Sequence, residues 1–301
     1  MNDAGIGRDH ATMAAGRKVA SVLSIAGTDP RGGAGIQADL KTFAACGVYG
    51  MAVTTAIVAQ NTCGVRRVQV LAADLVGDQL QAVLDDVHVD ALKIGMLGNA
   101  AVIRRVARIL RRRPVPALVL DPVLCSSSGR ALLEPEALKV LQHELLPLVT
   151  VLTPNLAEAE VLLGHGMVAD AAGMAVAARD LLKSGPDWVW LKGGHRLDGR
   201  CADVLVNAQG AGWLESPRVA GRYGHGTGCT LSSALAAELT RHRVPVAAER
   251  AKRFLYHALI HASSLEVGQG IGPLHHGHGA PAEGAAFALQ WQDWPDAPAT
   301  T

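Results

Sequence analysis

The sequence predicts an α/β fold in which a mostly parallel sheet is covered by helices on both faces. Two observations support this prediction. Short apolar segments rich in β-branched residues alternate with segments of helical period along most of the chain. Polar and glycine-rich clusters follow the expected strands. Alternating strands and helices form right-handed βαβ units, so these clusters should meet at one edge of the sheet, where ligands bind.

The elements of the first half follow from period and capping. The helix that begins at Gly35 has Ile36, Leu40 and Phe43 on one face, and Asn99 is a suitable N-cap for a later helix. Strands are expected at 19–25, 51–58, 91–94 and 118–120, and helices at 35–46, 75–87 and 99–112.

The second half continues the alternation. Pro154 stops a strand and Asn155 caps the helix that follows it. Strands are expected at 149–152, 188–191, 203–206 and near 213, and helices at 134–146, 155–163, 171–183, from 229 onward and at 246–267. Residues 1–17 are expected to form a flexible leader, 18–280 one domain, and the Ala/Pro/Gly-rich residues 281–301 a disordered tail.

Composition excludes several classes of function. The formal net charge is +1 and aromatic residues are 4% of the chain, which argues against a nucleic-acid-binding surface. No apolar run approaches the roughly 20 residues that span a bilayer. The five cysteines are odd in number and form no C-x-x-C pair. A disulfide framework or zinc site is therefore not expected, and a cytoplasmic location is.

A glycine-rich turn at Gly226-Thr227-Gly228-Cys229 leads into an alanine-rich helix. Glycines let backbone amides approach an anion, and a helix N-terminus favours negative charge, so a phosphate group fits there. The same position predicts that the Cys229 thiol ionises readily. Read alone, the segment is better explained as an ordinary glycine turn with Cys229 as a small buried side chain, because glycine turns are common.

Three further clusters carry possible ligand contacts. Glu158 lies one turn into the helix capped by Asn155, where it could hold magnesium or simply complete a capping box. Asp39 follows a loop of four glycines, which is not a P-loop, and could accept a bond from a substrate hydroxyl. The amide of Gln60 matches the hydrogen-bonding edge of an aminopyrimidine, or belongs to a Gln-Asn turn.

Long motifs containing these residues are spread along the chain. In chain order they are Ile25-Ala26-Gly27-Thr28-Asp29-Pro30, Gly32-Gly33-Ala34-Gly35-Ile36-Gln37-Ala38-Asp39-Leu40-Lys41-Thr42-Phe43, Val58-Ala59-Gln60-Asn61-Thr62, Lys93-Ile94-Gly95-Met96-Leu97, Thr153-Pro154-Asn155-Leu156, Lys192-Gly193-Gly194-His195 and His225-Gly226-Thr227-Gly228-Cys229-Thr230-Leu231-Ser232. Together they resemble the hydroxymethylpyrimidine/phosphomethylpyrimidine kinase family of thiamine biosynthesis, within the ribokinase-like superfamily. The resemblance spans residues 18–280 and decides against the ordinary readings of the separate motifs.

The resemblance implies a ribokinase-like three-layer αβα sandwich, MgATP as phosphoryl donor and a hydroxymethyl aminopyrimidine as acceptor, phosphorylated to the monophosphate and then to the diphosphate. Dimers and a monovalent cation are also expected on this basis. The implied contacts with the pyrimidine are Gly27, Asp39 and Gln60, and the residues implied to line its ring are Val58, Met96 and Val123.

The resemblance also implies the parts of the transfer site. Gly226, Thr227 and Gly228 correspond to the anion hole, and Cys229 stands where most of the superfamily has an aspartate base. Four residues correspond to groups that position magnesium and the phosphates: Asp121, Asn155, Glu158 and Lys192.

Two other functions remain open at this point. A pyridoxal kinase would share the fold and phosphorylate a pyridine hydroxymethyl group, although Gln60 and Met96 favour the pyrimidine. A non-catalytic pyrimidine-binding regulator would keep the pocket, although the intact glycine turn argues against it. The arginines at 104–113 are expected to form a solvated helix face, and the histidines at 275–278 are not expected to bind a metal.

Overall fold

The computed structural model describes residues 19–124, 133–166, 170–193, 200–279 and 289–293. Within these residues a nine-stranded sheet has the order β13-β10-β9-β8-β7-β6-β5-β1-β2. The strands are β1 (Ser21–Ala26), β2 (Tyr49–Thr54), β5 (Ala91–Ile94), β6 (Leu118–Leu120), β7 (Val151–Leu152), β8 (Trp188–Leu191), β9 (Arg200–Val206), β10 (Gly210–Pro217) and β13 (Leu289–Asp293). Strands β2 to β8 in this order are parallel, and β9, β10 and β13 pair antiparallel.

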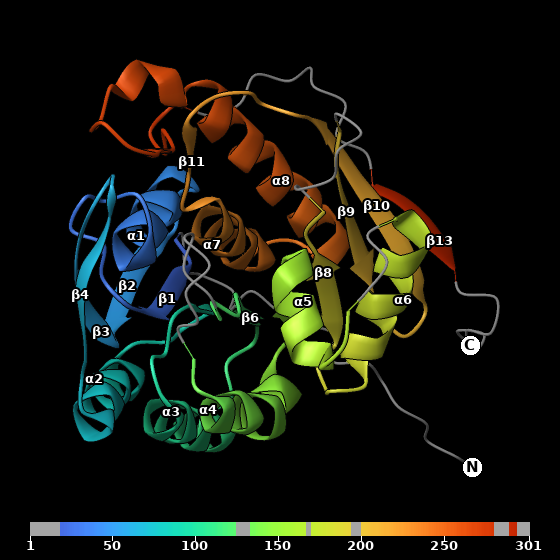
Figure 1. The fold of residues 1–301 in the computed structure, drawn as a ribbon. Helices are drawn as coiled ribbons and strands as arrows, with labels where there is room; N and C mark the ends of the chain where they lie inside the picture. Colours follow the sequence, from blue (N-terminus) through green and yellow to red (C-terminus); the bar gives the residue numbers. More distant parts are fainter. Residues whose placement is uncertain (1–18, 125–132, 167–169, 194–199, 280–288, 294–301) are drawn as a thin grey trace, which may run out of the picture.

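Helices cover both faces of the sheet, as the sequence predicts (Figure 1). One face carries α1 (Gly35–Ala45), α7 (Thr227–Leu239) and α8 (Val244–Ile260); the other carries α2 (Ala73–Asp86), α3 (Ala100–Arg112), α4 (Pro135–Val140), α5 (Leu156–Leu163) and α6 (Ala171–Leu182). Strand side chains alternate between the two layers. In β1, Leu23 and Ile25 enter one hydrophobic cluster while Val22 enters the other.

The predicted strand 51–58 is divided in the structure. Strand β2 ends at Thr54, and β3 (Ala56–Asn61) leaves the sheet to pair antiparallel with β4 (Gly64–Val70). The hairpin lies beside α1 and β2 in Figure 1. The hairpin carries Gln60, a predicted pyrimidine contact, on β3 and outside the main sheet.

Three other boundaries differ from the sequence prediction. The helix predicted at 134–146 is the short α-helix α4, which is followed by a π-helical turn at Leu141–Leu145 and a 3-10 turn at Leu146–Leu148. Helix α8 ends at Ile260 and a 3-10 turn covers Ala262–Leu265. The prediction that residues 281–301 are disordered is wrong for Leu289–Asp293, because these residues form β13 and pair with β10 at the sheet edge. The predicted leader at 1–17 lies outside the described residues.

The parallel strands bring their carboxyl ends to one edge, as the alternation predicts. There β1 leads into the first glycine loop, β6 into Asp121, β7 into Asn155 and β8 into Lys192. A second small pairing joins β11 (Tyr223–His225) to β12 (Gly272–Pro273) just before α7. None of the helices in the described part of the chain is long and apolar enough to cross a membrane.

Candidate active site

The glycine turn at the start of α7 is fixed against the first glycine loop. Gly226 has φ of +84°, a left-handed conformation that favours glycine. A Cβ at this position would overlap the carbonyl oxygen of Gly33. The turn that was predicted to bind the transferred phosphoryl group therefore rests directly on the loop that follows β1, and both positions require the absence of a side chain.

Cys229 lies in the first turn of α7, where the Gly35 backbone favours a negative charge on its sulfur. Burial raises the pKa of the Cys229 thiol to about 11; Lys93 acts in the opposite direction, and Asp39 adds to the rise. The prediction of a readily ionised thiol is therefore wrong for the protein without substrates. Desolvation outweighs the favourable position at a helix N-terminus.

Asp39 is fully buried beneath this turn. Its Oδ1 accepts bonds from Lys93 Nζ at 2.9 Å and Ser233 Oγ at 2.7 Å, and its Oδ2 from Lys93 Nζ at 2.8 Å and Ser24 Oγ at 2.5 Å. A carboxylate has about four lone-pair sites. A direct contact between Asp39 and a substrate hydroxyl stays a prediction, and it would require one of these bonds to be exchanged.

Gly228 lies next to an ion pair formed by Asp121, which follows β6, and Lys192, which follows β8. A Cβ on Gly228 would lie 3.1 Å from Asp121 Oδ2 and 3.3 Å from Lys192 Nζ. Lys192 and Asp121 are themselves joined by a contact of 2.9 Å between Nζ and Oδ1. Although burial disfavours its ammonium, the carboxylates of Asp121 and Glu158 raise the pKa of Lys192. A fixed cation is thus placed beside the glycine turn.

Glu158 forms the capping box that the sequence allowed. Its Oε2 accepts from the Asn155 amide at 2.8 Å, and Asn155 Oδ1 accepts from the Glu158 amide at 2.9 Å. Burial raises the pKa of Glu158 to about 7, with Lys192 opposing and Asp121 adding to the rise. The cap uses one carboxylate oxygen, so a capping role and a role toward magnesium are compatible.

The predicted pyrimidine residues gather around the end of β1. A Cβ on Gly27 would lie 2.8 Å from the Met96 Cε atom, so these two residues are in contact distance. Val58 on β3 donates its amide to Thr28 Oγ1 at 3.0 Å, which joins the hairpin to the loop after Gly27. Val123 is half-buried two residues beyond Asp121, at the end of β6.

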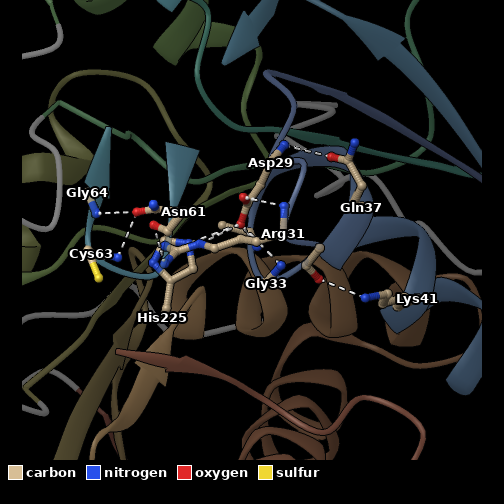
Figure 2. A network of polar contacts seen from close by, with 11 residues as sticks. Asp29, Arg31, Gly33, Gln37, Lys41, Asn61, Cys63, Gly64 and His225 are labelled. Carbon is tan, nitrogen blue, oxygen red and sulfur yellow. Dashed lines mark hydrogen bonds and ion pairs between the residues drawn. The ribbon is translucent and has the colours of Figure 1, made fainter. Parts of the chain in front are cut away.

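The sequence assigned no role to Asp29, yet this carboxylate organises the first glycine loop (Figure 2). Asp29 Oδ2 accepts from the amides of Gly33 and Ala34 at 3.1 and 2.8 Å, and His225 Nε2 lies 3.1 Å away. Burial would raise the pKa of Asp29, but its bond with His225 and the charge of Arg31 lower it to about 2. The available signal was an acidic residue before a glycine run.

The same network reaches the hairpin. Arg31 Nη1 donates to the Asn61 carbonyl oxygen at 3.0 Å, and Arg31 Nε lies 3.3 Å from Asp29 Oδ2. Asp29 thus links the loop after β1, the residue before Gly226 and the hairpin that carries Gln60. The predicted acceptor pocket and the predicted transfer turn are parts of one connected structure.

A sequence profile of the phosphomethylpyrimidine kinase family matches residues 29–275. The chain is 48% identical over 259 residues to the hydroxymethylpyrimidine/phosphomethylpyrimidine kinase of Salmonella typhimurium, a match that covers 86% of this chain and 97% of the relative. The enzyme of the same name from Escherichia coli is 47% identical with the same coverage. The chain belongs to the phosphomethylpyrimidine kinase family.

Solved structures agree with this membership and with the ribokinase-like αβα fold. The pyridoxal kinase of Staphylococcus aureus in complex with ADP has a TM-score of 0.82 at 32% identity, covering 91% of this chain and 99% of that one. The phosphomethylpyrimidine kinase of Clostridium difficile has a TM-score of 0.71 at 40% identity, covering 79% and 99%.

The arginines of α3 and the histidines at 275–278, for which the sequence predicted no functional role, make contacts within the fold. The arginines of α3 make exposed ion pairs, such as Arg104 with Glu136 at 2.8 Å. His276 is buried and bonds Thr230 Oγ1 at 2.9 Å, while His278 stacks on His261. Among the described residues no group of three His, Cys, Asp or Glu side chains is placed to hold a metal ion.

Proposed function

We propose that this protein transfers the γ-phosphoryl group of ATP to the hydroxymethyl group of 4-amino-5-hydroxymethyl-2-methylpyrimidine, and then phosphorylates the monophosphate to the diphosphate. One observation carries the proposal. The amide turn at the start of α7 lies against both the Lys192–Asp121 pair and the first glycine loop. Family membership and the names of the most similar relatives support the same reaction.

The chain's own groups have distinct tasks in this proposal. Phosphoryl transfer needs positioning and neutralisation of charge more than covalent help. The amides of Gly226, Thr227 and Gly228 would hold the transferred group at the positive end of α7, and Lys192 would offset its charge. Gly27, Gln60 and Met96 would hold the pyrimidine, with Val58 and Val123 beside the ring.

A magnesium ion fits the residues present. Asp121 and Glu158 supply two carboxyl groups against one cation, Lys192, so negative charge is in excess there once Glu158 ionises above about pH 7. Mg²⁺ is commonly held by one or two carboxylates together with substrate phosphates and water. When bound, the ion would neutralise phosphate charge. Asp121 and Glu158 would orient it, and Asn155 would keep Glu158 in place through the capping box.

Cys229 is proposed as the group that receives the proton of the substrate hydroxyl. Its thiol is protonated near neutral pH before substrates bind, so the proposal requires that binding favour the thiolate. The substitutions Cys229→Ser and Cys229→Asp test this role through turnover and its pH profile. Near-wild-type turnover in the serine variant would contradict it.

The test of the whole proposal is product identification. Purified protein is incubated with MgATP and hydroxymethylpyrimidine, and mono- and diphosphate are separated by chromatography. We expect both products. We expect Gly228→Ala to reduce their formation by about 100-fold, because the added Cβ would crowd Asp121 and Lys192 and displace the amide, a loss comparable to that of one oxyanion donor. Absence of product with binding of the pyrimidine intact would favour a non-catalytic regulator.

Pyridoxal phosphorylation is a second candidate, favoured by the likeness to pyridoxal kinase structures. The same assay with pyridoxal as acceptor decides it: a higher kcat/KM for pyridoxal would replace the pyrimidine assignment. A dimeric state, a cytoplasmic location and use of a monovalent cation remain parts of the proposal, supported by the family resemblance.

A further inference from the structure

Lys93 is a fully buried cation beneath the transfer turn, and the reaction as described gives it no role. It lies on β5, whose carboxyl end faces the site. A Cβ on Gly95, two residues further on, would lie 3.0 Å from Lys93 Nζ, so the glycine leaves room for the ammonium group. Burying an ammonium group is costly, and it is tolerated only where a partner compensates it.

The partner is Asp39. Ser233, which lies one helical turn after Cys229, connects this pair to α7. Ser233, which donates to Asp39 Oδ1, is four residues after Cys229 on α7, so both side chains are on the same helix face. On the other side, the Gly35 backbone favours a negative charge on the Cys229 sulfur, and Asp39 is four residues further along α1. Two helices therefore place the Lys93–Asp39 pair beneath the sulfur.

Four charged groups on the surrounding elements interact electrostatically with the Cys229 sulfur: Lys93 on β5, Asp39 on α1, Asp121 after β6 and Lys192 after β8. Lys93 favours a negative sulfur, and Asp39 and Asp121 oppose it. Although burial opposes its charged form, Asp39 raises the pKa of Lys93. Lys93 therefore stays positive at every pH at which the enzyme would work.

We propose that Lys93 is a positioning residue that holds Asp39 under the transfer turn and stabilises negative charge on the Cys229 sulfur. This role rests on the proposed function. The thiol first gives its proton to water. The thiolate then takes the proton of the substrate hydroxyl as the new O–P bond forms and the bond between the γ-phosphorus and ADP breaks. Lys93 acts through space and does not touch the reacting atoms.

Opposite substitutions in the pair test the proposal. Cys229 alkylation by iodoacetamide is followed at pH 8.5 by mass spectrometry of its peptide, without nucleotide or pyrimidine. Well below the pKa, one unit of pKa changes the thiolate fraction about tenfold. We expect Lys93→Met to slow alkylation about tenfold and Asp39→Asn to accelerate it about tenfold.

Cys63 provides the internal control, because it is exposed on the hairpin and its alkylation rate should not change. The double variant Lys93→Met with Asp39→Asn leaves no unpaired buried charge, and its rate should return to within about threefold of wild type. If Lys93→Met does not fold, the double variant still isolates the Lys93 charge by comparison with Asp39→Asn alone, which should react about tenfold faster.

The outcomes separate this inference from the proposed function. Equal rates, or changes of the same sign in the two single variants, would overturn the role of Lys93, because a merely structural pair would loosen the site in both. Failure of the wild-type protein to phosphorylate the pyrimidine would overturn the proposed function and leave the alkylation result intact. Where the enzyme is active, Lys93→Met should lower kcat with the KM for ATP unchanged.

Discussion

Two kinds of buried charge stand in contrast in this molecule. Lys252 on α8 and Asp203 on β9 form an ion pair with 2.6 Å between Nζ and Oδ2. Asp203 also accepts from Trp190 Nε1 and the Gly193 amide, so we call this a closed pair: its hydrogen bonds are made within the protein. At the open edge of the sheet, Lys192 faces two carboxylates, Asp121 and Glu158. The first group is balanced within the protein, whereas the second carries excess negative charge once Glu158, whose pKa is raised to about 7, is ionised.

The difference indicates what each group is for. A buried ion pair whose hydrogen bonds are all made within the protein has no charge left to bind a ligand. Its role is structural, because removing one partner leaves an uncompensated buried charge. A site with one cation too few is stabilised by binding another cation. The Lys93–Asp39 pair belongs to the first kind by its bonding, yet it lies beneath Cys229, so its field reaches the transfer turn.

The largest effect is expected from breaking the closed pair. Lys252→Met leaves the Asp203 carboxylate buried without its ion partner, which should cost about 3–5 kcal/mol of unfolding free energy. At about 2–4 °C per kcal/mol, the melting temperature measured by calorimetry should fall by roughly 10 °C. A fall of less than 2 °C, about 1 kcal/mol or less, would contradict the closed-pair description. Alkylation of Cys229 serves as the control and should be unchanged.

An intermediate, pH-dependent effect is expected at the open cluster. Because the folded pKa of Glu158 is raised to about 7 from 4.5, the folded protein holds a proton there that the unfolded chain has released. Stability should therefore fall as pH rises from 4.5 to 7. Glu158→Gln removes this dependence.

Urea unfolding at a series of pH values measures this effect. The free energy of unfolding of Glu158→Gln relative to wild type should increase between pH 4.5 and 7, and added MgCl₂ should stabilise wild type more than the variant at pH 7.5. A constant difference across that range would show that the Glu158 carboxylate is already compensated within the fold.

The smallest effect is expected at an exposed pair. Lys183 and Asp180 on α6 are 2.6 Å apart, but the lysine side chain is 76% exposed. Solvent screening limits such pairs to about 0–1 kcal/mol. Lys183→Ala should shift the melting temperature by no more than about 4 °C. A larger shift would mean that burial does not determine how much the closed pair, the open cluster and this exposed pair contribute to stability.

Much of this architecture could be predicted because it is encoded locally. Periods of two and 3.6 residues located the strands and helices, and Asn99 and Asn155 cap the helices that they were predicted to cap. The convergence of the site at one sheet edge followed from the alternation of these elements. Family motifs then supplied the predicted roles of residues such as Gln60, whose side chain has no distinctive pattern of its own, and these roles stay predictions.

The remaining features depend on long-range contacts. Strand β13 was missed because its pairing partner, β10, is more than 70 residues away and its flanks are rich in alanine and proline. The raised pKa of Cys229 depends on burial, which a helix-terminus pattern does not report. The hairpin was missed because Ala56–Asn61 continues the apolar pattern of β2, although it pairs with β4.

The backbone overlap that excludes a side chain from Gly226 has a mechanical consequence. With Gly33 pressed against this turn and Asp29 tied to His225, neither loop can shift without displacing the other. Redesign of the acceptor pocket through residues 29–35 would therefore alter turnover even where the new acceptor fits. Changes at Val58 or Gln60 approach the predicted acceptor pocket from the hairpin, which is joined to the turn indirectly through Arg31 and Asp29, so they should disturb the predicted phosphoryl-binding turn less.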